Sequence, residues 1–109
     1  MSINLPAPIA GYFTAENSDD TEALTTCFAP DAIVRDEGRR IQGIAAIKAW
    51  KRDGKAKYQH KIKVIAASEK DGETIVRGLV SGKFPGSPIE LDFAFALKDG
   101  VIAALEVRP

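Results

Sequence analysis

The sequence predicts a single α+β domain over residues 1–109, in which three N-terminal helices cover a cone-shaped, curved antiparallel sheet. Apolar residues recur at helical spacing in the first half of the chain and alternate with polar residues in the second half. Two Asp-Gly pairs, Asp71-Gly72 and Asp99-Gly100, sit between apolar runs, where this dipeptide favours tight hairpin turns. A chain of this length builds one hydrophobic core.

Prolines, a capping residue and apolar residues at helical spacing predict the first two helices. Pro6 and Pro8 suit a first helical turn, where a missing N–H costs nothing, and residues 9–16 follow with one amphipathic face. The second helix is predicted to begin at Asp19, with a glutamate three residues later as in a capping box, and to end before Pro30. Its inward stripe would be Ala23, Leu24, Cys27 and Phe28.

A short strand pair precedes the third helix. Residues 32–36 predict a strand, Glu37-Gly38 a turn, and residues 39–42 a return strand. The third helix is predicted to begin at Gly43 and to end near Gly54. Its apolar side would carry Ile44, Ile47 and Trp50, and its solvated side Lys48, Lys51, Arg52 and Lys55.

The second half predicts a four-stranded antiparallel meander at approximately 60–69, 73–84, 88–98 and 101–107. In its third strand Phe93 and Phe95 face the helices, whereas Glu90 and Asp92 face away.

The second of these strands carries apolar residues on both faces, with Ile75 and Leu79 on one and Val76 and Val80 on the other. A sheet that is apolar on both faces needs a cover on both. In so short a chain the second cover is most simply another subunit, so we expect a homodimer through the outer sheet face.

The composition restricts the cellular location and the binding partners that we expect for the protein. One cysteine, Cys27, excludes an internal disulfide and is expected to serve packing, and the longest apolar run, Phe93–Leu97, is too short for a membrane span. The first eight residues lack the pattern of a secretory signal, so we expect a cytoplasmic protein without membrane contact.

Residues 35–63 hold ten basic and three acidic side chains. This excess of positive charge predicts either a solvated face neutralised by the acidic helices or a surface that binds an anionic ligand. Nucleic-acid binding is not favoured, because no aromatic residues alternate with the basic ones.

Two segments carry a resemblance to a known family. The run IAGYFTAENSDDTEALTTCFAPDAIVRDEGRRIQGIAAIKAW from Ile9 to Trp50, together with FALKDGVIAALEV near the C-terminus, resembles the nuclear-transport-factor-2-like superfamily. Within it the chain is most similar to the SnoaL-like polyketide cyclase and ketosteroid isomerase branch. The resemblance implies a cystatin-like roll with a hollow end, and a superfamily of isomerases, cyclases, dehydratases and transport adaptors.

The resemblance implies roles for three residues. Asp36 falls where isomerase-like members place their catalytic base, Tyr12 near the tyrosine that donates to the enolate oxygen, and Trp50 where an aromatic residue lines the pocket. Phe93 stands where the isomerases place a second, protonated aspartic acid, and Asp92 beside it points to the opposite face. This departure argues against steroid isomerase activity proper.

Each candidate also has a structural interpretation. Asp36 is either a base or an Asx-turn residue, and Tyr12 is either an acid or a core tyrosine. His60, the sole histidine, is either a second base beside Asp36 or an idle surface residue. The predicted ligand-binding residues are Trp50, Phe13, Phe28, His60, Phe93 and Phe95.

The leading hypothesis is a small-molecule-binding domain, acting as an acid/base isomerase or cyclase on a cyclic or polyketide-like carbonyl compound. We expect no metal or redox cofactor, because one histidine and one cysteine offer no ligand spacing and no glycine-rich loop fits a nucleotide. The alternative is a non-catalytic module for ligand binding, dimerisation or protein interaction.

Overall fold

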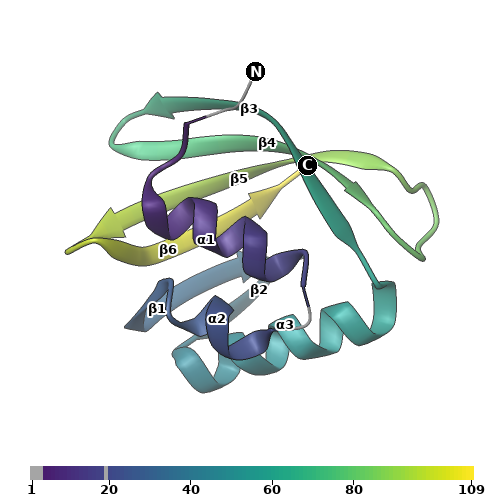
Figure 1. The fold of residues 1–109 in the computed structure, drawn as a ribbon, viewed down its shortest axis with the longest axis horizontal. Helices are drawn as coiled ribbons and strands as arrows, with labels where there is room; N and C mark the ends of the chain where they lie inside the picture. Colours follow the sequence, from purple (N-terminus) through teal and green to yellow (C-terminus); the bar gives the residue numbers. More distant parts are fainter. Residues whose placement is uncertain (1–3, 19) are drawn as a thin grey trace.

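A six-stranded curved sheet packs against a group of helices in the computed structural model, which describes residues 4–18 and 20–109 (Figure 1). The helices are α1 (Ala7–Glu16), α2 (Thr21–Thr25) and α3 (Ile44–Tyr58). The strands are β1 (Phe28–Asp36), β2 (Arg39–Gln42), β3 (Lys61–Lys70), β4 (Glu73–Ser81), β5 (Ile89–Lys98) and β6 (Val101–Arg108). The predicted α+β class and the curved sheet are confirmed. None of the helices in the described ranges has the length and hydropathy that a bilayer crossing requires.

The sheet order β2-β1-β6-β5-β4-β3 joins the short strand pair to the meander. Both residues of the β3–β4 turn, Asp71 and Gly72, have positive φ, at 54° and 81°, as the predicted tight hairpin requires. The join itself is a parallel pairing of β1 with β6, which the sequence did not predict. It places the end of β1, and with it Asp36, beside the C-terminal strand.

Strand β1 begins four residues earlier than predicted, at Phe28, and therefore contains Pro30. The pairing of β1 with β6 shifts register between Phe28 and Ile33. Proline is tolerated at such irregularities because its missing N–H removes no regular ladder bond. The proline thus marks a break in the strand pairing and not the end of the preceding helix.

Helix α2 is shorter than predicted, ending at Thr25, so Cys27 and Phe28 lie beyond it although both are buried. The Cys27 carbonyl accepts from the Ile102 N–H at 2.8 Å, which draws the chain into the sheet instead of another helical turn. The predicted cap, Asp19, lies outside the described residues. The Asp20 side chain caps the helix by accepting from the Ala23 N–H at 2.9 Å.

Helix α3 continues one turn past Gly54, where it was predicted to end, and stops at Gln59, whose φ of 48° is left-handed. A glycine inside a helix costs only about 1 kcal/mol. The added turn brings the Lys55 ammonium to the backbone carbonyls of Glu16, at 3.2 Å, and His60, at 2.5 Å. The stabilisation from these charge-assisted hydrogen bonds is larger than the free-energy cost of the glycine.

The basic face of α3 is only partly solvated. Lys48 forms an ion pair with Glu22 of α2, as expected for a face neutralised by the acidic helices. Lys51, predicted on the solvated side, is buried with 2% of its surface exposed. Its ammonium instead bonds backbone carbonyls at the end of α1.

A close contact between strands depends on Gly78 of β4. A Cβ atom at this position would lie 2.8 Å from Ile62 Cγ2 and 3.0 Å from Phe93 Cε1. Real Cβ atoms essentially never come as close as the Ile62 contact, so a side chain there would have to displace the buried side chains of Ile62 and Phe93.

Gly78→Ala is therefore expected to lower the free energy of unfolding by about 1–3 kcal/mol, measured by urea denaturation. Gly54→Ala is the matched control, because the nearest atom to its Cβ would be His60 Cε1 at 3.9 Å. The helix propensity of alanine should then stabilise the protein by up to about 1 kcal/mol. Equal effects of the two substitutions would contradict the packing argument.

The outer face of the sheet is mixed in character. Arg77 donates to Glu90 at 3.1 Å and to Asp92 at 3.0 Å, which shows that both acids face away from the helices as predicted. The register places Ile75 and Leu79 on this same face. The homodimer through the face stays a prediction.

Leu79→Lys tests the dimer, because a lysine at the centre of an apolar contact would be desolvated on association. Light scattering after size exclusion should give a dimer for the natural chain and a monomer for the variant, with little change in thermal unfolding of the monomer. A monomeric natural chain at high concentration would refute the dimer.

Candidate functional site

A pocket of about 490 Å³ lies between α1, α3 and the sheet. This volume is within the range of small-molecule sites, roughly 300–1,000 Å³. Its buried walls include Tyr12, Glu16, Lys51, Ile62, Val80 and Phe93. Exposed residues, among them Glu37, Arg39, Asp53 and Lys57, form its rim.

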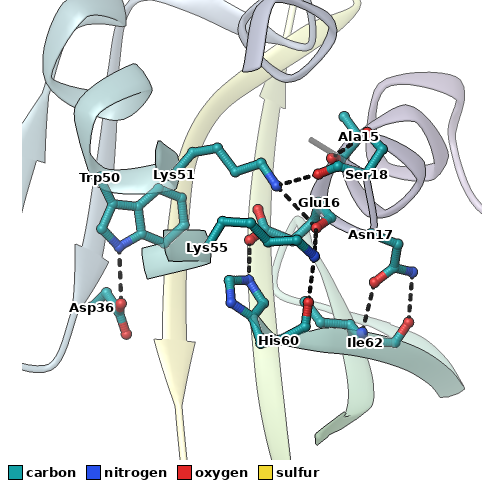
Figure 2. Close-up of polar contacts among 10 residues, drawn as sticks. All are labelled: Ala15, Glu16, Asn17, Ser18, Asp36, Trp50, Lys51, Lys55, His60 and Ile62. Atoms are coloured by element: carbon teal, nitrogen blue, oxygen red, sulfur yellow. Dashed lines mark hydrogen bonds and ion pairs between the residues drawn. The ribbon is translucent and has the colours of Figure 1, made fainter. Parts of the chain in front are cut away.

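Asp36 and Trp50 meet on one wall of the pocket (Figure 2). Trp50 Nε1 on α3 donates to Asp36 Oδ2 at the end of β1, at 3.0 Å. The bond fixes the carboxylate against an indole ring. Within the described residues no backbone N–H of the Glu37-Gly38 turn bonds the Asp36 carboxylate, so the Asx-turn interpretation has no support.

Tyr12 forms part of the inner wall, with 1% of its surface exposed. Burial raises the pKa of its hydroxyl well above the usual range, and the negative charges of Glu16 and Asp36, with a weak hydrogen-bonding contact to the Glu16 side chain, raise it further. The phenol is therefore neutral at physiological pH and able to donate a hydrogen bond. Since both carboxylates act on it, the hydroxyl lies within electrostatic reach of each.

The predicted aromatic residues divide into wall and core. Trp50 and Phe93 line the pocket, whereas Phe13, Phe28 and Phe95, which were predicted to bind ligand, do not. These three pack around Tyr12 with ring centroids 5.0, 5.9 and 5.4 Å away, each edge to face. Phe13, Phe28 and Phe95 therefore hold the Tyr12 ring in place, and the pocket lining gives no support to the prediction that they bind ligand.

His60 lies just before β3 and lines the pocket, but its partner is not Asp36. Its Nε2 is in close contact with Oε1 of Glu16. Glu16 is 3% exposed, and its other oxygen, Oε2, has no hydrogen-bond partner among the described residues. Sequence reasoning missed Glu16 as a site residue; the available signal was a charged residue one helical turn from Tyr12 on the apolar face of α1.

Three side chains fix the end of α1 that carries Glu16 (Figure 2). Lys51 Nζ donates to the carbonyls of Glu16, at 3.0 Å, and Ser18, at 2.8 Å. Lys55 Nζ also donates to the Glu16 carbonyl. Asn17 exchanges two hydrogen bonds with the Ile62 backbone, at 2.7 and 2.8 Å. Cations at a helix C-terminus satisfy carbonyls that have no partner within the helix and complement its dipole.

Two strand arginines lie away from the pocket. Arg77 is on the outer sheet face, and the exposed Arg35 is not part of the pocket. Arg39 and Lys57 are exposed basic residues that line the pocket. In the described ranges no group of three or more His, Cys, Asp or Glu side chains could hold a metal ion.

Comparison with known proteins matches residues 9–105 to the family model described as a SnoaL-like domain. Among solved structures, a candidate polyketide cyclase from Sinorhizobium meliloti is 42% identical, with 95% of each chain covered and a TM-score of 0.92. A ketosteroid isomerase-like protein from Catenulispora acidiphila, solved with trimethylamine, is 18% identical, with 97% of this chain and 87% of that chain covered and a TM-score of 0.82. The Δ5-3-ketosteroid isomerase from Mycobacterium sp. is also 18% identical, with 94% and 90% covered and a TM-score of 0.78. No curated protein matches.

The raised pKa of Tyr12 predicts a loss of stability in alkali. An unfolded tyrosine ionises near pH 10, before the folded one, so the stabilisation from the buried neutral phenol is complete below pH 10 and is lost as pH rises through the folded pKa. Tyrosinate absorbance should show a step above pH 10 that disappears in Tyr12→Phe and persists in the control Tyr58→Phe. A Tyr12 step at the ordinary value would contradict its burial.

Proposed function

Because the chain belongs to the SnoaL-like domain family, we propose that it binds a cyclic or polyketide-like carbonyl compound in the pocket and moves a proton between carbon and oxygen of that ligand. The observation that carries the proposal is that Asp36 and Tyr12, from different elements, line one pocket. The 42% identity to a candidate polyketide cyclase supports the ligand class.

Asp36 is the base in this proposal. Trp50 holds Oδ2, and no hydrogen bond to Oδ1 is found within the described residues, which leaves that oxygen able to reach a C–H bond. A carboxylate positioned in this way contributes a factor of about 10²–10⁴ to a proton transfer. The reaction needs no metal or redox cofactor, and the absence of a cofactor stays a prediction.

Tyr12 donates to the oxygen on which negative charge develops. A neutral donor fixed by surrounding rings stabilises an enolate without reorganising during the reaction. The resemblance puts Phe93 at the position of a second donor; Phe93 is buried, while Asp92 is bonded to Arg77 on the outer face. One donor suits a more acidic carbon, such as one between two carbonyl groups, better than a simple ketone. This preference fits polyketide-like compounds.

Deuterium incorporation beside the carbonyl of 2-tetralone, followed by NMR in heavy water, tests the role of Asp36. Asp36→Asn should slow the catalysed exchange by about 100-fold or more and leave the thermal unfolding midpoint nearly unchanged. Asp31→Asn is the matched control, since Asp31 is an exposed residue of β1 outside the pocket. Undiminished exchange in Asp36→Asn would remove Asp36 from the mechanism.

A non-catalytic ligand-binding or protein-interaction module is the second candidate, favoured by Phe93 in the place of a donor. The same probe separates the two candidates, because Trp50 is the only tryptophan and lines the pocket. Quenching of its fluorescence by 2-tetralone without catalysed exchange would support a binding module. Strongly salt-dependent association with an acidic protein would support an interaction module using the basic residues of α3.

A further inference from the structure

The geometry points to a second hydrogen-bonding centre in the same pocket, in which Glu16 Oε2, backed by His60, accepts a hydrogen bond from a hydroxyl group of the ligand. The inference deepens the proposed function and rests on it for the ligand class. The substrate class becomes a carbonyl compound that carries a hydroxyl group away from its acidic carbon.

The first observation is an unsatisfied buried oxygen. Glu16 is 97% buried and lines the pocket, yet its Oε2 has no hydrogen bond of regular geometry among the described residues; the Tyr12 hydroxyl makes only a weak contact with the Glu16 side chain. A buried polar atom left without a partner costs about 1–3 kcal/mol, and more for a charged group. Such an atom on a pocket wall is satisfied when a ligand supplies the missing donor.

The contact with His60 decides which kind of ligand group fits. His60 Nε2 faces Glu16 Oε1, so the proton between them lies on the nitrogen or on Oε1. In the first case Glu16 is a carboxylate, and in the second Oε2 is the carbonyl oxygen of a carboxylic acid. With either placement Oε2 can only accept, and the ligand must donate.

Two neighbouring cations bind the backbone around Glu16. Lys51 and Lys55 approach Glu16 from α3, but the bonds found for their ammonium groups go to the carbonyls of Glu16, Ser18 and His60. They fix the backbone that carries Glu16. They also place positive charge near its carboxylate, so a neutral hydroxyl is a sufficient partner and a cationic ligand is not required.

The dyad formed by Glu16 and His60 is separate from Asp36. In Figure 2 Asp36 and Trp50 lie together at the left of the view, and the dyad lies nearer the centre, below Lys51. Tyr12, one helical turn before Glu16, is within reach of both carboxylates. Asp36 and the dyad line the same pocket as Tyr12, so a ligand bound against Tyr12 can present its acidic carbon to Asp36 and a second polar group to the dyad.

Three matched probes test the inference: 6-hydroxy-2-tetralone, 6-methoxy-2-tetralone and 2-tetralone. The hydroxy compound can donate to Oε2, and the methoxy compound cannot. Trp50 quenching should show the hydroxy compound binding about 10-fold tighter than either of the others, as satisfying a buried acceptor that otherwise has no partner implies.

Glu16→Leu should abolish this preference. Leucine is close to glutamate in size and offers no acceptor in place of Oε2, so the affinity ratio should fall to within about 2-fold. Asp36→Asn should keep the preference for the hydroxy compound. The binding test therefore distinguishes an error in this inference from an error in the proposed role of Asp36 as the base. Glu69→Gln, an exposed change outside the pocket, should keep it as well.

A measurement on the natural chain covers the case in which Glu16→Leu does not fold. His60 is the only histidine, so its ring signals in NMR spectra are assigned directly. The hydroxy compound should shift them more than the methoxy compound does. Equal affinity for the three probes, or a preference that survives in folded Glu16→Leu, would overturn the inference.

Discussion

The structure depends on the attachment of the C-terminal end of α1 to α3 and β3. Lys51, almost fully buried, donates to the carbonyls of Glu16 and Ser18, and Asn17 exchanges two bonds with the backbone of Ile62. A buried ammonium is stable only where acceptors surround it, and the last carbonyls of a helix are such acceptors. This attachment sets the distance between the first helix and the sheet, and therefore the width of the pocket between them.

The same attachment explains why the pocket has two polar ends. It buries Glu16 beside His60, while the parallel pairing of β1 with β6 carries Asp36 to the indole of Trp50. Between them the Tyr12 ring is fixed by Phe13, Phe28 and Phe95. Rigid support of this kind lets a donor act without a cost of reorganisation. The proposed proton transfer and the proposed hydroxyl contact are thus two uses of one rigid frame.

Where local signals were strong, the predicted elements agree with the structure. The Asp-Gly turns, the alternation along β5 and the apolar face of α1 predict their elements correctly, because each depends on neighbours within a few residues. The errors fall where a distant contact outweighed a local one. Pro30 lies in an irregular strand pairing with β6, and α3 passes Gly54 because Lys55 finds carbonyls of α1 and of His60.

The candidate site likewise has features that the sequence predicted and features that only the structure revealed. The sequence by itself determined that Asp36 ends a strand, that Tyr12 lies on a buried helical face and that Phe93 and Asp92 face opposite ways, since periodicity decides each of these. Only the tertiary structure decided that Lys51 is buried and that Glu16 meets His60, 44 residues away in the chain. Spacing along the chain reports the face of an element, whereas the partner across the core follows from how helices and sheet pack.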